Sequence, residues 1–369
     1  MKTIGIDVNA LTRPYRTGVE LYVFELIRAM MLVPLQPQEN VVLYASAIVD
    51  DLGVLPQGWS WRVITWPLPK GWTHGRLSLE LVLRTSDVFF SPGHEVPIFT
   101  GRTKIVSTVH DLAFLRRPDL YPASGNYRQN WAVKHNSERA ERLLAISTVT
   151  KQDLVELLDI EMDRVDVVPL ACPSQSLEHA DEEILAKYSL VAKQYFVSIG
   201  RLEKKKNIAF LIRAFSSWKQ KTGKPHKLIL AGSWGWGKEE IERAIAISNI
   251  KNDIILTGYL PEEQKGDLIS RSSAYCFPSN YEGFGLPALD AFYYKVPLLA
   301  ADLPIFHEVA GDAAYFAGVE NLSAWMEGFD LAAKGELEHL INQGAERLAQ
   351  FSWEHTAKGT WKSLRACYA

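Results

Sequence analysis

The sequence predicts an α/β fold built from two doubly wound domains that face each other across a cleft. The chain has 369 residues, which is too long for one ordinary core and fits two domains. Short β-branched or aromatic runs alternate with longer segments of helical period, as in parallel sheets wrapped by helices. This alternation stops once, near the middle of the chain, and then resumes, so each half is expected to form its own sheet.

The first half starts with a strand and continues as alternating strands and helices. Strands are expected at 4–8, 41–45, 62–65, 88–91, 104–109, 143–146 and 165–168. The first helix takes its apolar face from Leu21, Phe24, Leu26, Ile27 and Met30, and another helix is expected at 126–140. Together these elements predict a first domain spanning residues 1–172.

A break in the strand pattern at 169–174 marks the expected hinge. An acidic, helical stretch at 177–188 follows it, and the second domain is predicted to span 173–350. Its strands are expected at 195–198, 228–231, 254–257, 274–277, 298–300 and 314–316. The last segment, 351–369, has a helical pattern without a strand partner, and we expect it to pack back across the two domains.

Composition and charge exclude several classes of protein. The net charge is −3, from 40 basic and 43 acidic side chains, so nucleic acid is not an expected partner. The three cysteines, Cys172, Cys276 and Cys367, lack the spacing of a disulfide framework or a zinc site, which favours a reducing, cytoplasmic location. Asp7 interrupts the apolar run that a signal peptide needs, and no stretch is long enough to span a membrane, which leaves only peripheral membrane contact.

A cluster of cations follows the first strand of the second half. Gly200 and Arg201 come directly after that strand, and Lys204, Lys205 and Lys206 precede a helix. Arg201 offers a planar fork of donors and Lys206 a compact charge, so together they can clamp a diphosphate through charge-assisted hydrogen bonds. The alternative is a solvated basic turn.

A glycine-rich turn, residues 281–290, follows a later strand of the same half. Gly283 and Gly285 let the backbone approach a ligand, and Pro287 suits the first turn of a helix, whose free N–H groups attract an anion. Glu282 and Asp290 bracket this turn and can accept hydrogen bonds from hydroxyl groups. The alternative is that both are ordinary acidic residues at a helix start and on a surface.

Loops of the first half supply weaker candidates. His110, followed by Asp111, ends a strand and can donate to a sugar hydroxyl or a developing charge, although a structural histidine is the alternative. Gly18 opens the first helix and can let it approach a phosphate of the bound nucleotide, with Arg13 and Arg16 beside it as acceptor contacts. His94 is a further acceptor-side candidate; for it, a solvated loop residue is the alternative.

The glycines at 232–237 do not form a dinucleotide-binding fingerprint, because their spacing differs from G-x-G-x-x-G. We interpret this segment as a turn whose tryptophans, Trp234 and Trp236, pack on a base or on the other domain. The sequence also lacks an Asp-x-Asp metal motif in the loops that carry the candidate residues.

Taken together, these residues resemble the retaining glycosyltransferases of the GT-B fold, family 4, also called group 1. The resemblance runs through "STVHDLAF", "AISTVTKQDL", "SIGRLEKKKNI", "CFPSNYEGFGLPALDAF" and "FSWEHTAK" and so covers nearly the whole chain. It implies two Rossmann-like domains, the second of which binds the donor. The chain departs from the family at Asp290, where a glutamate that contacts the ribose is usual, and at 169–171, which replaces a Pro-Asn-Gly ending.

The resemblance also implies a role for each candidate. Arg201 and Lys206 would bind the donor diphosphate, and His110 would contact the donor sugar. Glu282 would hold the sugar hydroxyls together with the backbone of Phe284, Gly285 and Leu286, while Asp290 would contact the ribose. His110, Arg201, Lys206 and Glu282 form the expected catalytic set.

The implied reaction is retaining and needs neither a metal nor a cofactor. It transfers a sugar, with mannose from GDP-mannose preferred, to a glycan or lipid-linked acceptor in polysaccharide or lipopolysaccharide biosynthesis. The alternatives are an epimerase or a phosphorylase on the same scaffold, or a non-catalytic protein that binds a sugar or nucleotide. The expected location is the cytoplasm, with peripheral contact at the inner membrane face through Arg13, Arg16, Lys70 and Trp72.

Overall fold

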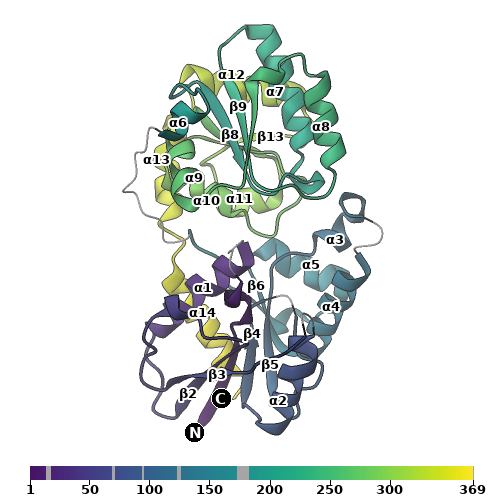
Figure 1. Ribbon diagram of the computed structural model, residues 1–369, viewed down its shortest axis with the longest axis vertical. Coiled ribbons are helices and arrows are strands. Elements are labelled where there is room, and N and C mark those ends of the chain that lie inside the picture. The colour runs from purple at the N-terminus through teal and green to yellow at the C-terminus, as the bar shows by residue number, and fades with distance from the viewer. Residues whose placement is uncertain (14–17, 69–70, 94, 123–125, 173–182, 369) are drawn as a thin grey trace. The chain divides into compact units, whose positions relative to one another are not determined.

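The computed structural model describes residues 1–13, 18–68, 71–93, 95–122, 126–172 and 183–368 (Figure 1). The chain divides into two compact units, each of which is considered by itself. The first unit contains Met1–Arg116, Ser124–Pro173 and Ser352–Ala369, and the second contains Arg117–Ala123 and Ser174–Phe351. Each unit has one parallel sheet with helices, which confirms the predicted α/β class.

The sheet of the first unit has the strand order β3-β2-β1-β4-β5-β6-β7, and all of its pairings are parallel. Ile4 pairs with Val41 on one side and Val88 on the other, and all three side chains are buried. The strands are β1 Lys2–Asp7, β2 Glu39–Ala45, β3 Trp59–Val63, β4 Val88–Ser91, β5 Lys104–Val109, β6 Ala140–Ala145 and β7 Val165–Val167.

The third strand begins earlier than the sequence pattern predicts. It spans Trp59–Val63 instead of 62–65, because Trp59, Ser60 and Trp61 already pair with β2 from Val41 onward. Trp59 is buried and packs edge-on against Trp361, with 6.1 Å between the two ring centres, so tertiary packing sets the start of this strand.

Six α-helices accompany this sheet in the part of the first unit that the structure describes. They are α1 Gly18–Met31, α2 Ser78–Leu83, α3 Ala113–Arg116, α4 Asn126–Arg139, α5 Thr148–Leu158 and α14 Trp353–Ala366, and a π-helical turn at Trp72–Leu77 leads into α2. Although α14 comes last in the chain, it packs along α1. The indole N–H of Trp361 donates to Met30 O at 3.3 Å, and Arg365 binds Glu39.

The sheet of the second unit has the order β10-β9-β8-β11-β12-β13, again with parallel pairings. Its strands are β8 Tyr195–Ile199, β9 Lys227–Ala231, β10 Ile254–Gly258, β11 Ala274–Phe277, β12 Leu298–Ala301 and β13 Tyr315–Ala317. The helices of this unit are α6 Glu183–Lys187, α7 Ile208–Thr222, α8 Lys238–Ile247, α9 Glu262–Ser270, α10 Leu286–Tyr293, α11 Pro304–Ala310, α12 Leu322–Lys334 and α13 His339–Leu348.

Aromatic packing fixes β8 against the helices of the second unit. The centre of the Phe196 ring lies 6.1 Å from the ring centre of Phe215, 5.4 Å from that of Trp218 and 4.7 Å from that of Phe329. All four side chains are buried. The order of strands along the chain reverses between β8 and β11, and ligands of open α/β sheets bind beyond the carboxyl ends of strands at such a point. Rigid packing beneath β8 therefore supports the loops that leave this edge.

Candidate active site

The turn after β8 is held in place by the loop that follows β9. Gly232 has a φ of +141°, and a Cβ atom there would lie 1.9 Å from Gly200 O, so only glycine fits. Leu202 N–H donates to Ser233 O at 2.9 Å, and Lys204 N–H donates to Trp236 O at 2.7 Å. The segment 232–237 is thus a turn, as predicted, and it fixes the backbone of the cationic cluster.

Arg201 and Lys206 line the same pocket at the carboxyl ends of β8 and β11. The rest of its lining comes from the ends of the two strands, from the turn after β8 and from the start of α7: Ser198, Ile199, Gly200, Leu202, Ile208, Phe277, Pro278 and Ser279. The Arg201 side chain is 64% exposed and lies 3.7 Å from the Glu203 carboxylate. Its guanidinium is therefore available to an anion at this edge of the sheet.

Lys206 is paired with Glu282 in this pocket. The Lys206 ammonium donates to Glu282 Oε1 at 2.5 Å, and Ser279 Oγ donates to the same oxygen at 2.6 Å. Both members of the ion pair are largely buried, since their side chains are 18% and 10% exposed. The ammonium also lies 5.3 Å from the centre of the Phe277 ring, which favours a cation at that point.

The electrostatic surroundings keep Glu282 ionised. Burial acts to raise the pKa of this carboxyl, but the ammonium groups of Lys206 and Lys205 and the hydrogen bonds from Lys206 and Ser279 lower it below its usual value. Two further hydrogen bonds from Asn280 join the loops that carry these charges: its backbone N–H donates to Lys205 O at 2.9 Å, and its side-chain amide donates to Lys204 O at 3.3 Å.

The glycine-rich turn begins α10 beside this ion pair. Gly285 precedes α10 with a φ of +113°, and a Cβ there would lie 3.1 Å from the Phe306 ring and 3.3 Å from the Phe277 ring. Phe284 is buried against Phe351, so its side chain anchors the turn and only its backbone is offered to a ligand. Leu286 is the first residue of α10 and Pro287 follows it, as the sequence predicts.

Two residues that sequence analysis missed also shape this site. Ser279 binds Glu282, and Tyr275 donates its hydroxyl hydrogen to Ile199 O at 2.9 Å, which links the ends of β8 and β11. Burial, together with the charge of Asp290, raises the pKa of Tyr275 far above its usual value, so this hydroxyl stays protonated. Asp290 itself is half-buried in α10.

The first unit places its candidates at the carboxyl edge of its own sheet. His110 follows β5, and its Nε2 lies 2.9 Å from Pro92 O, while its ring meets Tyr22 edge-on at 4.9 Å. Arg13 is exposed and pairs with Glu20 at 2.5 Å. Gly18 is the first residue of α1, and a Cβ there would meet no atom within 4 Å, so packing does not require glycine. Arg16 and His94 lie outside the described residues.

An acidic pocket at this edge was not predicted. Asp7, Asn9, Arg13, Glu20 and Glu95 contribute to its lining. Burial raises the pKa of the Asp7 carboxyl to about 7, opposed by a hydrogen bond from Asn9 N–H and assisted by the charge of Glu95. The signal in the sequence was an acidic residue at the end of the first predicted strand.

The expectation that Trp72 contacts a membrane is wrong. Its side chain is buried, and its indole N–H donates to Ile64 O at 2.8 Å. Lys70, paired with it in that expectation, lies outside the described residues. Within the described part of the chain, no helix combines the length and apolarity needed to cross a bilayer.

Comparisons with known proteins agree on one family. Residues 181–347 match the family model described as "Glycosyl transferases group 1". The O-antigen chain mannosyltransferase B of Escherichia coli is 28% identical over 278 residues, which cover 74% of this chain and 72% of that protein. The serotype-specific mannosyltransferase WbdA of Escherichia coli is 30% identical over 292 residues, or 73% of this chain, but this chain spans only 35% of that longer protein.

A solved structure supports the same fold over the full length. The crystal structure of Anabaena HepE in complex with UDP and glucose has a TM-score of 0.73 and 15% sequence identity, and the match covers 99% of this chain and 100% of that one. At this identity the likeness concerns the fold alone. It confirms the predicted two-domain α/β architecture.

Proposed function

Because the chain is a glycosyltransferase of group 1, we propose that it transfers mannose from GDP-mannose to a growing glycan or a lipid-linked acceptor. The two relatives described above are named as mannosyltransferases, one of them for an O-antigen chain, which supports the choice of sugar and a role in lipopolysaccharide biosynthesis. We further propose that the reaction takes place in the cytoplasm, at the inner face of a membrane.

The observation that carries this proposal is the convergence of Arg201, Lys206 and Glu282 beside the glycine turn at 283–285. A leaving nucleoside diphosphate gains negative charge as the bond to the sugar breaks, and preorganised cations and amides stabilise that charge. Arg201 and Lys206 supply the cations, and the N–H groups at the start of α10 add the positive end of a helix dipole.

Glu282 is suited to hold the sugar. Its carboxylate is ionised and already accepts two hydrogen bonds, so it can also accept one from a sugar hydroxyl, as the backbone of Phe284, Gly285 and Leu286 can help to do. Asp290 would contact the ribose through its shorter side chain. His110 would contact the donor sugar, and its Nε2–H, which donates to Pro92 O, orients the ring.

We propose that transfer retains the anomeric configuration and needs no metal ion. The acceptor hydroxyl would attack from the face that the diphosphate leaves, and a phosphate oxygen would take its proton. In this scheme Glu282 anchors hydroxyl groups and forms no bond to the sugar.

One experiment separates this function from its alternatives. The purified chain is incubated with GDP-mannose or other nucleotide sugars, with and without a mannose-terminated oligosaccharide, in buffer containing EDTA, and the products are analysed by mass spectrometry and NMR. We expect an extended oligosaccharide with an α-linked mannose. A sugar isomer formed without acceptor would indicate an epimerase, phosphate-dependent release of a sugar phosphate would indicate a phosphorylase, and donor binding without turnover would indicate a binding protein.

A further inference from the structure

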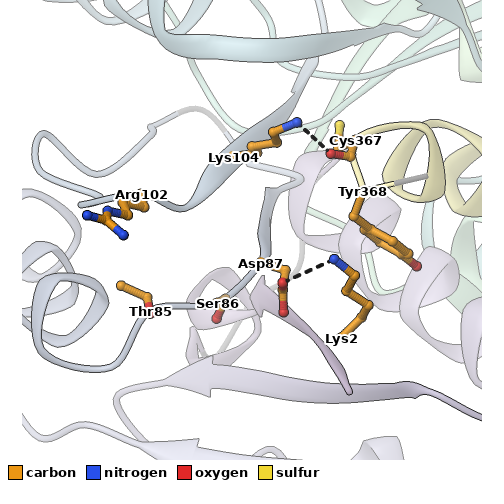
Figure 2. Close-up of a pocket in the computed structure, with 8 residues that line it drawn as sticks. All are labelled: Lys2, Thr85, Ser86, Asp87, Arg102, Lys104, Cys367 and Tyr368. Atoms are coloured by element: carbon orange, nitrogen blue, oxygen red, sulfur yellow. Dashed lines mark hydrogen bonds and ion pairs between the residues drawn. The ribbon is translucent and has the colours of Figure 1, made fainter.

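A pocket lies at the amino-terminal edge of the first unit's sheet, and Figure 2 shows its lining. Lys2 begins β1, Asp87 directly precedes β4 and Lys104 begins β5, and these three strands are neighbours in the sheet. The volume of the pocket is about 460 Å³, and the rest of its lining is Thr85, Ser86, Arg102, Cys367 and Tyr368. Because β5 is six residues long, the pocket lies roughly 20 Å from the opposite edge, where the candidate residues of this unit are found.

Positive charge prevails in the lining of this pocket. Lys2, Arg102 and Lys104 are cations, and Asp87 is the one carboxylate among the lining residues. Asp87 is already engaged, since it lies 3.5 Å from the Lys2 ammonium and accepts a hydrogen bond from Thr3 N–H at 2.8 Å. Arg102 is exposed, Figure 2 shows no interaction between it and the other residues drawn, and it has no acidic partner in the part of the chain that the structure describes. An anion is therefore the ligand that this pocket suits.

Two of the three cations are held in place by neighbouring groups. Lys104 Nζ donates to Cys367 O at 2.8 Å, and the Lys2 ammonium lies 5.6 Å from the centre of the Tyr368 ring. Lys104 also lies 3.9 Å from Glu141, but this ion pair is long and half-exposed, so solvent weakens it. An ammonium group has three N–H donors, so both lysines keep donors for a ligand. Side chains that are already ordered also lose less conformational freedom when a ligand binds.

The rest of the lining is polar and narrows the choice of anion. Thr85 and Ser86 offer hydroxyl groups, and Ser86 Oγ is buried without a hydrogen-bond partner among the residues that the structure describes. None of the lining residues is leucine, isoleucine, valine or methionine, so the acyl chain of a lipid would find no apolar partner in this pocket. A small hydrophilic anion fits such a lining better than a lipid does.

We propose that this pocket binds a small phosphorylated molecule, with Arg102 binding its phosphate and Lys2 and Lys104 adding positive charge around it. A guanidinium presents a planar fork that matches phosphate oxygens, and the ammonium groups act as point charges. The volume of about 460 Å³ falls in the range of small-molecule sites and exceeds what a phosphate alone needs, which favours a phosphate monoester of a hydrophilic molecule such as a sugar. This site is distinct from the cations of the second unit that are proposed to bind the donor, and the inference does not depend on the transferase proposal.

Calorimetric titration of the native chain with glucose 6-phosphate tests this inference, in phosphate-free buffer at physiological ionic strength. Arg102→Gln is expected to weaken binding at least about tenfold, because a charge-assisted hydrogen bond to the phosphate is lost. Arg102→Lys should weaken it less, because the charge remains while the planar fork is lost. Glucose 6-phosphate should also raise the Tm of the native chain more than that of Arg102→Gln, because a ligand of the folded state stabilises it in proportion to its affinity.

Two control variants locate the binding. Arg84→Gln removes a nearby cation that pairs with Glu80 and does not line the pocket, so it should change the affinity by less than about twofold. Arg201→Ala removes a cation of the donor site and should leave this binding intact, which distinguishes failure here from failure of the transferase proposal. All three arginines are exposed, so thermal unfolding without ligand should match the native chain. No binding at millimolar glucose 6-phosphate, an equal loss in Arg84→Gln, or a loss in Arg201→Ala alone would each overturn the inference.

Discussion

Replacing Lys206 by alanine should destabilise the second unit, because the Glu282 carboxylate would stay buried without its cation. Removing one partner of a buried ion pair costs about 3 to 5 kcal/mol. Ser279 still donates to Glu282 in the variant, so we expect about 3 kcal/mol, the lower end. For a unit of this size, that corresponds to a fall in Tm of roughly 6 to 12 °C. Thermal unfolding of the ligand-free protein at pH 7 measures this directly.

Two control variants separate the buried charge from other causes. Lys206→Met combined with Glu282→Gln removes both charges and should recover about half of the lost stability or more, because no uncompensated carboxylate remains. Lys204 lies on the same turn but pairs with Glu240 at 3.8 Å on a more exposed surface, so Lys204→Ala should change Tm by less than about 3 °C. An unchanged Tm in Lys206→Ala, or a double variant no more stable than the single one, would refute the reasoning.

The pH dependence of stability gives an independent reading of the same pair. The folded protein holds the pKa of Glu282 below its usual value, so the stabilisation from this group is complete above the unfolded-state pKa of about 4.3 and is lost as pH falls through the lower folded value. Without Lys206 the pKa rises, since burial then prevails over the remaining interactions. The deficit of Lys206→Ala should therefore be largest at pH 7 and shrink as the pH approaches 4.

Further substitutions test the remaining site residues. Arg201→Ala should keep the native Tm, because this side chain is exposed, but lower donor affinity measured by calorimetry by roughly 1.5 to 3 kcal/mol. Gly285→Ala should cost about 1 to 3 kcal/mol in unfolding experiments, because its φ is +113° and two phenylalanine rings crowd the added methyl, whereas Gly18→Ala should cost far less. His110→Ala should lower kcat more than donor affinity, and an equal loss in both would reduce it to a binding residue. The raised pKa of Asp7, about 7, means that the folded state of the first unit loses stability as pH rises from about 4 through 7, and Asp7→Asn should remove that slope in unfolding measured across this range.

The sequence predicts most strands of both sheets because buried parallel strands are short apolar runs. The predicted 195–198, 228–231 and 274–277 lie within the observed β8, β9 and β11. The pattern fails where one strand face is partly exposed, as in β3, whose start is set by the contact of Trp59 with Trp361 far along the chain. Residue spacing alone cannot predict a contact between residues so far apart in the chain.

The candidate site was predictable as a set of residues but not as a set of interactions. The sequence places Lys206 and Glu282 each at the carboxyl end of a strand, which brings both to one edge of the sheet. That they form one buried ion pair depends on β8 and β11 being neighbours and on the hydrogen bonds from Asn280. Trp72 could not be placed from the sequence. Its indole N–H is buried with the carbonyl oxygen of Ile64 as its acceptor, and no local pattern distinguishes it from an exposed tryptophan.

The position of α14 sets an order on folding during synthesis. This helix packs along α1 and buries Ala357, Trp361 and Leu364 in the unit that the ribosome makes first. The other unit is nearly continuous along the chain and can complete its core once Phe351 has emerged. Of the two units, the one whose translation begins first can therefore complete its core only after α14 has been synthesised. Until then, the face of α1 that packs against α14 stays unburied in the nascent chain.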